Sequence, residues 1–370
     1  MKVFISLADR SASNYVYHIF KDIKGLDLWG IVDERLLSIG IKGNWRVEDF
    51  SVVGFWEALW KVPKVFKFFR EFEDLIDRVD VLILCDAPAL NIPLLKKAKG
   101  RAKKIIYFIS PQVWAWKEER ARIISELSDH LIVILPFEVD FYKRYSRDGF
   151  NVHYVGHPLV DIAKPSLDEG RVKAFLGFER YLCLMPGSRW SEVKRHAPYL
   201  RKVYEYLLKT FDLSAAIPTF EPFLDYLKDV FKGLPVRIVS PKDMEQPSYN
   251  ILAYSEFSIV ASGTAELEAS LLLNPHAVFY RVNPISFFIA KRLVKVRNIA
   301  LTNLILSSQI VPEVVQKDYR ELAYVCEEIL KDDGIRKRMK EDFLRLRQVL
   351  GPEGTLDRLR SLFVSLLEEV

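Results

Sequence analysis

The fold of this chain is decided by the stretch Leu182-Cys183-Leu184-Met185-Pro186-Gly187-Ser188-Arg189-Trp190-Ser191-Glu192-Val193. Its first residues form a short apolar run that predicts a buried strand, and Pro186-Gly187 ends that run before a helix. The first helical turn holds Ser188 and Arg189, so free backbone N–H groups, the positive end of the helix dipole and a guanidinium gather there. The stretch therefore predicts a strand–turn–helix unit that binds an anion, although Pro-Gly-Ser is also a plain strand exit in many α/β proteins.

A second strand–turn–helix unit follows further along the chain. The strand at 257–260 leads into Ala261-Ser262-Gly263-Thr264-Ala265-Glu266-Leu267-Glu268. Two phosphate-type turns, the second with a carboxylate near the helix start, predict a nucleoside diphosphate bound by its phosphates and its ribose. Ser262, Gly263 and Thr264 would join the first turn on the phosphates, and Glu268 would accept hydrogen bonds from the ribose. The alternative for Glu268 is an ordinary helix carboxylate.

Short apolar runs alternate with helical patterns along the whole chain. The runs that predict strands are 3–7, 79–85, 104–109, 131–135, 181–184, 213–217, 236–239, 257–260 and 276–280. They are apolar on both faces, which indicates an α/β fold with parallel, doubly wound sheets. Ligands bind at the carboxyl ends of strands in such sheets, and the loops 86–88, 110–112, 186–188 and 262–264 carry the polar residues there.

Composition limits the classes of partner. The chain has 370 residues, enough for two domains, and a net charge of +5 from 54 basic and 49 acidic residues, which is too small to argue for a nucleic-acid partner. Cys85, Cys183 and Cys326 lack metal-ligand spacing and predict buried, reduced thiols. No cluster of His, Asp and Glu has ligand spacing either, so neither a metal nor a cofactor is expected.

The expected location is cytoplasmic, with peripheral contact to the inner membrane. The first residues predict a strand rather than a signal peptide, and no apolar run approaches the roughly 18–20 residues that span a bilayer. We expect a domain at 1–165, a second at 166–340, and C-terminal helices at 341–370 that pack on the first domain or on a partner subunit.

The segment 54–72 predicts an interfacial helix. At helical spacing Phe66 and Phe69 belong to one apolar face, lysines form an opposite stripe, and Phe68 lies beside the charged side. Pro63 should kink the helix or divide it in two. The expected membrane-binding residues are Phe55, Trp56, Leu59, Trp60, Phe66 and Phe69. A helix buried between domains is the alternative, and 286–297 is a candidate second basic-aromatic contact.

Eight motifs together resemble one family. The most specific is Ile109-Ser110-Pro111-Gln112-Val113-Trp114-Ala115-Trp116-Lys117, and the others are 135–138, 155–158, 185–189, 261–268, 290–295, 302–304 and 311–313. In this order they resemble motifs of lipid-A-disaccharide synthases. The resemblance implies a GT-B glycosyltransferase with two Rossmann-like domains facing across a cleft. It implies transfer of 2,3-diacylglucosamine from its UDP donor to 2,3-diacylglucosamine 1-phosphate, with inversion to a β-1,6 linkage and without a metal.

The resemblance also suggests roles for single residues. Asp86 ends an apolar strand and matches the candidate base of the family, and partial withdrawal from water would raise its pKa. The alternative is an aspartate that caps the next helix. Arg189 would stabilise the departing diphosphate. Further cleft candidates from family position are Arg281, Asn303 and Gln316. Trp114 and Trp116 are expected to anchor a loop or line an acyl chain, and His157 either approaches the diphosphate or is structural.

Two loops of the first half depart from the family pattern. The usual Gly-Glu-x-Ser-Gly-Asp corresponds to Ala8-Asp9-Arg10-Ser11-Ala12-Ser13, in which only Ser11 persists, and Asp86-Ala87-Pro88-Ala89-Leu90-Asn91 lacks the second acid of its motif. The sequence therefore supports the UDP-sugar donor better than the acceptor. It leaves open a related transferase with another acceptor, or a protein that binds a UDP-acylsugar without turnover. The family also suggests a homodimer through the C-terminal helices.

Overall fold

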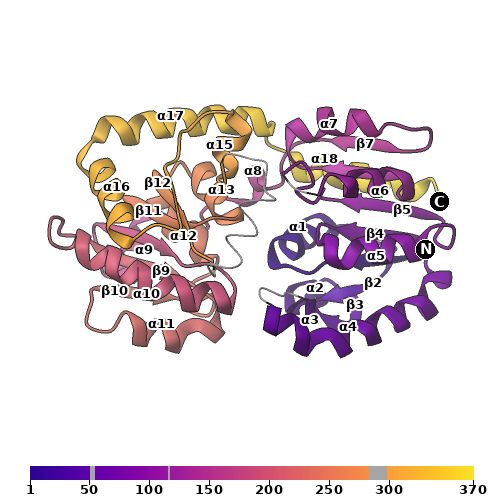
Figure 1. Cartoon of the computed structure of the whole chain (residues 1–370), viewed down its shortest axis with the longest axis horizontal. Coiled ribbons are helices and arrows are strands. Elements are labelled where there is room, and N and C mark those ends of the chain that lie inside the picture. Colours follow the sequence, from indigo (N-terminus) through magenta and orange to yellow (C-terminus); the bar gives the residue numbers. More distant parts are fainter. Residues whose placement is uncertain (51–54, 116, 283–297) are drawn as a thin grey trace. The chain divides into compact units, whose positions relative to one another are not determined.

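The chain forms two compact units (Figure 1). The computed structural model describes residues 1–50, 55–115, 117–282 and 298–370, and the side chains of 55–62 are not described. The first unit holds the described residues of 1–161 and 350–370, and the second holds those of 162–349. We predicted that the first domain ends at residue 165, but residues 162–165 belong to the second unit. The chain returns to the first unit at Leu350.

The first unit is built on a parallel sheet. Its described strands are β1 (Lys2–Ser6), β2 (Asp27–Val32), β3 (Lys42–Arg46), β4 (Val81–Cys85), β5 (Lys104–Phe108), β6 (His130–Val133) and β7 (Asn151–Tyr154). They lie in the order β3-β2-β1-β4-β5-β6-β7, with all neighbours parallel. The order reverses between β1 and β4, so the loops after these two strands flank the switch point where such sheets bind ligands.

Helices cover both faces of this sheet. They are α1 (Arg10–Phe20), α2 (Glu34–Ser38), α3 (Val47–Phe50), α4 (Phe55–Leu75), α5 (Pro88–Ala98), α6 (Glu119–Leu127), α7 (Pro136–Tyr142), α8 (Leu159–Ile162) and α18 (Thr355–Glu368). One layer contains α2, α1 and α18, and the other contains α4, α5 and α6. The C-terminal helix α18 belongs to this unit because Phe363 packs against Phe20 and Phe108, and Arg360 donates to the carbonyl of Ile19.

The second unit repeats the same plan. Its described strands are β8 (Tyr181–Met185), β9 (Ser214–Pro218), β10 (Val236–Val239), β11 (Phe257–Ala261), β12 (His276–Tyr280) and β13 (Glu313–Val315). They lie in the order β10-β9-β8-β11-β12-β13, again parallel throughout. This order reverses between β8 and β11, which are the two strands that precede the predicted phosphate turns.

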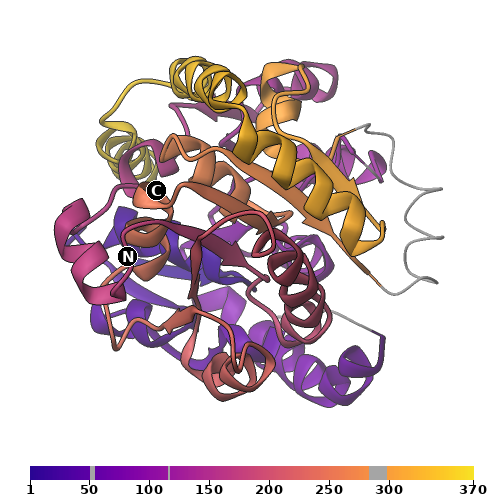
Figure 2. The ribbon, with the colours of Figure 1, turned by 90° about the vertical axis from the view of Figure 1, so that its left-hand side faces the viewer.

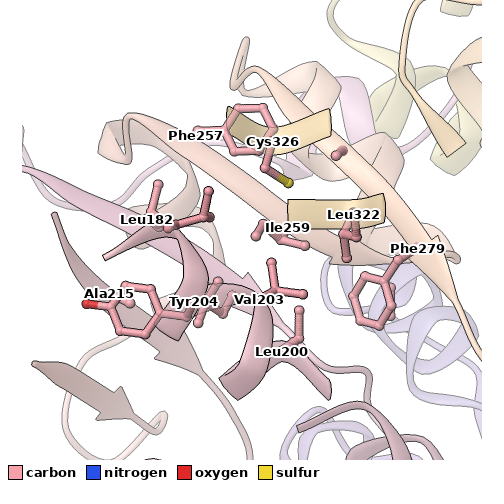
Figure 3. Packing of buried hydrophobic residues seen from close by; sticks show 14 of the residues in the cluster. Leu182, Leu200, Val203, Tyr204, Ala215, Phe257, Ile259, Phe279, Leu322 and Cys326 are labelled. Carbon is pink, nitrogen blue, oxygen red and sulfur yellow. The ribbon is translucent and has the colours of Figure 1, made fainter. Parts of the chain in front are cut away.

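Two helical layers enclose the second sheet, which Figure 2 turns toward the viewer. The helices are α9 (Glu169–Leu176), α10 (Trp190–Leu207), α11 (Leu224–Val230), α12 (Pro247–Tyr254), α13 (Thr264–Leu271), α15 (Leu301–Leu306), α16 (Tyr319–Lys331) and α17 (Asp333–Leu350). One layer joins α11, α10 and α16, and the other joins α9, α12, α13 and α15. Between α10, α16 and the sheet lies a core that includes Leu200, Tyr204, Phe257 and Phe279 (Figure 3).

The predicted fold class is confirmed: both units are Rossmann-like, doubly wound α/β domains. All nine predicted strands form, with ends displaced by one or two residues. The sequence interpretation missed β2, β3, β7 and β13. Three of these are edge strands, and β3 reads Lys-Gly-Asn-Trp-Arg. An edge strand is partly exposed and polar, so it lacks the continuous apolar run that identifies a central parallel strand.

The prediction for helix α4 needs two corrections. The helix continues through Pro63, so it is not divided in two there. Phe68 is buried rather than beside the solvent face, and it packs against Trp45, Phe50 and Phe72. The buried side of α4 is thus centred on Phe68 and Phe72, which turns Phe66 outward.

Membrane crossing was also assessed on the structure. Within the described parts of the chain, no helix combines the length and the hydropathy that a bilayer crossing requires.

Candidate functional site

The second unit brings its two predicted phosphate turns to one edge of the sheet. Strands β8 and β11 are adjacent, and Met185 at the end of β8 pairs with Val260 of β11. The turns 186–189 and 262–264 follow these strands directly, so both lie at the topological switch point. The turns that the sequence predicted to cooperate are therefore neighbours.

The first turn has an anion-binding geometry that an internal carboxylate already uses. Arg189 is the N-cap of α10, and its Nη1 lies 3.2 Å from Glu192 Oε1. The Ser188 backbone N–H donates to Glu192 Oε2 at 3.2 Å. Gly187 has φ +113°, and a Cβ there would lie 2.7 Å from Glu192 Oε2. Glycine is required both by this backbone conformation and by the packing of Glu192 on it. The sequence interpretation missed Glu192, although it stands three residues after the N-cap, where acids commonly cap helices.

The second turn combines a braced serine with an open glycine. The Ser262 hydroxyl donates to the Ile299 carbonyl at 3.2 Å, and its backbone N–H donates to the Phe279 carbonyl at 3.0 Å. Gly263 is the N-cap of α13 with φ +150°, and no atom of the described residues lies within 4 Å of the place that a Cβ would take. Thr264 is the first residue of the helix. The turn therefore leaves its backbone open to a group as large as a phosphate.

Glu268 lies in the second turn of the same helix, α13. The Tyr249 hydroxyl donates to its Oε1 at 3.2 Å. Burial raises the pKa of Glu268 to about 7, and the hydrogen bond from Tyr249 opposes this shift. A carboxyl group with this pKa is mostly ionised above neutral pH. In that form both of its oxygens can accept hydrogen bonds, which is what the predicted ribose contact requires.

Arg281 and Gln316 follow the next two strands along the sheet. The Arg281 guanidinium lies over the Tyr199 ring at 4.7 Å, and its Nη1 donates to the Lys317 carbonyl at 2.7 Å. The side chain of Gln316 forms two hydrogen bonds with the backbone of Val282, at 2.8 and 3.0 Å. Gln316 therefore fixes the segment after β12 through its side-chain amide. Arg281 is the first residue of that segment and supplies a cation there.

His196 connects the end of β8 with the end of β12, and the sequence interpretation missed it. Its Nδ1 lies 2.7 Å from the Pro186 carbonyl, and its Nε2 lies 2.9 Å from the Arg281 carbonyl. The ring is fully buried, and this burial lowers its pKa. The helical spacing of Val193, His196 and Leu200 marks His196 as part of the buried face of α10, but it gives no sign of these carbonyl partners.

Asn303 is buried and committed to the chain itself. Its Nδ2 donates to the Val311 carbonyl and to Glu313 Oε1, at 2.7 and 2.8 Å. Its Oδ1 accepts from the backbone N–H groups of Ile310 and Val311. Both donors and the acceptor of the amide are thus used, which favours a bracing role over the predicted contact with substrate. The family motifs at 302–304 and 311–313 are therefore two halves of one structural brace.

The first unit places strained backbone at its own switch point. Asp86, Ala87 and Ile109 have φ values of +43°, +42° and +65°, which non-glycine residues rarely adopt. The N-cap of α5 is Ala87, directly after Asp86, and Ala87 itself supplies no side-chain cap. Strain of this kind is concentrated at functional sites, where the surroundings hold it in place.

Two side chains fix the Asp86 backbone. The Tyr107 hydroxyl donates to the Asp86 carbonyl at 2.7 Å, and Asn91 Nδ2 donates to the same carbonyl and to that of Cys85, at 2.9 Å each. Asn91 also accepts from the Ser6 hydroxyl at 2.6 Å, which joins the ends of β1 and β4. Asn91 is the last residue of the altered 86–91 motif and one of those that match the family, and its bonds explain why an amide serves there.

The altered loop after β1 forms a regular helix start. Asp9 caps α1 by accepting from the Ala12 N–H at 2.8 Å, and Ser13 donates to Asp33, the N-cap of α2. Arg10 forms an ion pair with Glu48 at 3.7 Å. Ser11 is the second residue of α1 and is partly exposed. The loop thus keeps Ser11 in the first turn of α1, after a strand that flanks the switch point, and its contact with substrate stays a prediction.

Glu138 is the most buried acid of this edge, with 1% of its surface exposed, and the sequence interpretation did not single it out. It accepts from the Trp114 indole Nε1 and from the Leu135 backbone N–H, at 3.1 Å each. Burial raises its pKa to about 8, and the charge of Asp86 adds to this shift. Trp114 therefore anchors its loop through Glu138, while Trp116 lies outside the described residues.

His157 is structural by its surroundings. It is buried, its Nδ1 accepts from the Leu159 N–H at 3.1 Å, and burial lowers its pKa to about 3. The three cysteines are free and buried, as predicted. Among the described residues no group of His, Cys, Asp and Glu is arranged to hold a metal.

Of the predicted membrane-binding residues, the structure describes the side chains of Phe66 and Phe69 only. Phe66 is 71% exposed, and Phe69 is partly exposed. Both line an open groove between α4 and α5, together with Lys67, Arg70 and Lys97. Phe55, Trp56, Leu59 and Trp60, like the 286–297 contact, lie outside the described side chains.

Comparison with solved structures identifies the fold. The S. aureus MnaA–UDP co-structure aligns with a TM-score of 0.66 at 13% identity, covering 100% of this chain and 97% of that chain. The UDP-GlcNAc 2-epimerase from Neisseria meningitidis, bound to UDP-GlcNAc, aligns with a TM-score of 0.65 at 13% identity and covers both chains fully. At this identity the similarity concerns the fold alone, which is of the GT-B type.

Comparison of sequences identifies the family. The lipid-A-disaccharide synthase of Aquifex aeolicus is 44% identical over 99% of both chains. That of Sulfurihydrogenibium sp. is 40% identical over 100% of this chain and 99% of its own. The family described as lipid-A-disaccharide synthetase matches residues 3–350. The two glycine turns of the second unit and the strained Asp86 loop of the first therefore stand in a chain that belongs to the lipid-A-disaccharide synthetase family.

Proposed function

We propose that this protein is an inverting glycosyltransferase that makes the lipid A disaccharide. It transfers 2,3-diacylglucosamine from UDP-2,3-diacylglucosamine to 2,3-diacylglucosamine 1-phosphate, and it releases UDP. The observation that carries the proposal is the pairing of two anion turns, 186–189 and 262–264, at the switch point of a sheet in a member of this family.

The donor is bound by the second unit in this proposal. Arg189 and the N–H groups of the two turns hold the diphosphate and stabilise the negative charge that develops as UDP departs. For this, Ser188 and Arg189 exchange Glu192 for a phosphate, since both now contact that carboxylate. Glu268 accepts hydrogen bonds from the ribose, and Arg281 adds a cation at the next strand end.

The acceptor is activated by the first unit. Asp86 accepts the proton of the acceptor hydroxyl as that oxygen attacks the sugar carbon opposite the UDP leaving group. Its backbone, held by Tyr107 and Asn91, fixes the direction of the carboxylate at the end of β4. Ser11, at the N-terminus of α1 across the same switch point, is placed to contact the acceptor phosphate.

The decisive experiment is an acceptor-dependent UDP-release assay. Purified protein receives UDP-2,3-diacylglucosamine with or without 2,3-diacylglucosamine 1-phosphate, and we expect UDP release only with the acceptor. Because the 8–14 loop departs from the family pattern, other acyl-sugar acceptors are tested with the same donor. Release with another acceptor alone would replace the acceptor assigned here, and tight donor binding without release on any acceptor would indicate a binding protein.

We also propose that the protein acts in the cytoplasm at the surface of the inner membrane, through helix α4. Phe66 is mostly exposed, and Lys67, Arg70 and Lys97 line the same groove together with one acid, Glu73, which pairs with Lys97. An exposed aromatic ring among basic side chains suits an anionic lipid surface, because the ring enters the interface and the cations contact the headgroups. Acylated substrates are extracted from such a surface.

Vesicle binding tests this contact. Phe66→Ser should weaken binding to anionic vesicles by about tenfold, since burying one Phe side chain contributes roughly 1.5–3 kcal/mol. The matched control is Tyr324→Ser on α16, where an aromatic ring is 59% exposed in the second unit. Equal vesicle binding by wild type and Phe66→Ser would remove α4 from the membrane contact.

A homodimer through the C-terminal helices stays a prediction. Helix α18 packs on α1 of its own chain, and α17 exposes Leu344 and Val349. Analytical ultracentrifugation of the wild type and of a Leu344→Ser/Val349→Ser variant measures whether α17 supports a dimer: a monomeric wild type contradicts it.

A further inference from the structure

The buried Glu138 has no role in the function proposed so far, although it lies at the same edge of the sheet as the proposed base. It is the third residue of α7, directly after β6, and β6 is separated from the Asp86 strand β4 only by β5. Both of its carboxylate oxygens accept hydrogen bonds, one from the Leu135 backbone and one from the Trp114 indole. A buried acid whose two oxygens meet two N–H donors is held in one orientation.

The Trp114 contact gives this acid a partner in the most specific motif of the chain. The indole is also clamped by Phe137, whose ring centroid lies 5.0 Å away in an edge-to-face arrangement. Close by, Ser110 of the same motif lies within hydrogen-bonding distance of the buried Tyr142 hydroxyl, at 2.9 Å. The loop after β5 is thus tied to α7 at two points, and only the Glu138 contact involves an acid.

We propose that Glu138 is a positioning residue for the transfer, which holds Trp114 at the end of β5 and strengthens Asp86 as a base when it becomes charged. This inference rests on the proposed transferase function. The charge of Asp86 already acts on Glu138, and the interaction is mutual: a charged Glu138 raises the proton affinity of Asp86. A base of higher proton affinity removes the hydroxyl proton more effectively.

The groups around Glu138 allow its carboxyl group to ionise near neutral pH. Burial raises the pKa of Glu138 to about 8, with the Asp86 charge in the same direction and the Leu135 and Trp114 donors in the other. Among the described residues the charge of Glu138 also acts on Tyr142 on α7 and Tyr154 on β7, and burial raises the pKa of both well above that of Glu138. They therefore stay neutral while Glu138 ionises, and the carboxylate then accepts a stronger hydrogen bond from the indole.

A substrate-free titration tests the contact. The tryptophan fluorescence of the intact protein is recorded against pH for wild type, Glu138→Gln and Trp114→Phe. We expect the wild type to show a transition near pH 8 that both variants lack. Glu126→Gln on α6, which loses an exposed ion pair with Arg122, is the matched control and keeps the transition. A transition that persists in Glu138→Gln overturns the assignment.

Kinetics test the role in transfer. In the wild type kcat for UDP release should rise across the same pH range, and in Glu138→Gln it should be flat and lower by about 10- to 100-fold at high pH. UDP affinity, which belongs to the second unit, should not change. Trp114→Phe keeps the ring but removes one donor to the carboxylate, so the rise in kcat should move to higher pH.

The outcomes separate the two proposals. A Glu138→Gln variant with the wild-type kcat profile overturns the positioning role, whatever its fluorescence shows. If the wild type shows the fluorescence transition but releases no UDP with any acceptor, the proposed function fails and the role of Glu138 in transfer fails with it. Should Glu138→Gln not fold, the shifted kcat profile of Trp114→Phe supports the role, and an unshifted profile contradicts it.

Discussion

The switch points of the two units use the same topology for opposite chemistry. In the first unit, the strained residues at strand ends are Asp86, Ala87 and Ile109, all with side chains, and the nearby titratable groups are acids. In the second unit the corresponding turns are built on Gly187 and Gly263, and Arg189 stands at the first of these turns. The contrast concerns the turns next to the two switch points, because Gln316, directly after the edge strand β13, also has a positive φ, of +56°.

The difference shows what each edge is built to hold. Glycine leaves a backbone open, so that N–H groups can approach an anion closely. A side chain forced into the same region costs roughly 1–2 kcal/mol, but it aims a functional group in a fixed direction. We therefore interpret the second edge as the diphosphate site and the first as the edge that directs a base. Four substitutions test this division.

The largest effect is expected for Asp86→Asn. The amide keeps the size of the carboxyl and tolerates the positive φ, but it cannot take the acceptor proton, so kcat for UDP release should fall by about 10²- to 10⁴-fold. UDP affinity, measured by calorimetry, should not change. Asp77→Asn, which only loses an exposed ion pair with Arg101, is the control. Full activity of Asp86→Asn would remove Asp86 from the base role.

The second largest effect is expected for Arg189→Gln, which should weaken UDP binding, whereas Asp86→Asn in the first unit should not. Loss of a charged hydrogen bond to the diphosphate contributes about 1.5–3 kcal/mol, so UDP affinity should fall by roughly 10- to 100-fold. Arg171→Gln on α9 removes an exposed arginine from the same unit and should bind UDP as the wild type does. Unchanged UDP affinity in Arg189→Gln would mean that the 186–189 turn is only a strand exit.

Glu268→Gln should change the pH dependence of stability. Folded Glu268 has a pKa of about 7 against an ordinary value of 4.5, so the folded state binds more protons between these pH values. Wild-type stability therefore falls as pH rises from 4.5 to 7, and the variant lacks this loss. We expect Glu268→Gln to gain about 3 kcal/mol relative to wild type between pH 4.5 and pH 8 in urea unfolding. Parallel pH profiles would contradict the buried carboxyl.

The smallest effect is expected for Ala87→Gly. Glycine relieves the positive φ at the N-cap of α5, which should stabilise the protein by up to about 1 kcal/mol after the entropy that glycine adds to the unfolded state. UDP release should nevertheless decrease, because the strain fixes the neighbouring Asp86. Urea unfolding and the release assay measure the two effects. A variant that is more stable and equally active would show that the strain has no part in the reaction.

The sequence indicated much of the donor edge, because its signals are local. Pro186-Gly187 ends a strand, Ser188 and Arg189 start a helix, and Gly263 precedes another helix, each within a few residues. The residues that were missed act over long distances along the chain. Glu138 meets Trp114 across 24 residues, and His196 meets the Arg281 carbonyl across 85. No spacing rule predicts such partners, because they depend on which strands become neighbours.

The packing of α4 and the hydrogen bonds of Asn303 also depend on distant parts of the chain. The apolar pattern of α4 predicted a helix, but which face packs inward depended on Trp45 and Phe50 from earlier elements, and they enclose Phe68. Asn303 carried a family motif, but its four hydrogen bonds within the chain were visible only in three dimensions. A sequence pattern shows that a residue is apolar or polar, but it does not show which residues pack against it or form its hydrogen bonds.

The sequence by itself determined two parallel α/β units, their phosphate-type turns and the membership of a family. These follow from local periodicity, from glycine and proline at strand ends, and from motifs that keep their order. Tertiary structure alone decided that β8 and β11 are adjacent, that Asp86 sits on strained backbone, and that Glu138 lies buried against Trp114. The physical reason is that strand order, burial and pKa depend on contacts between distant segments, whereas turns and helix starts depend on neighbours along the chain.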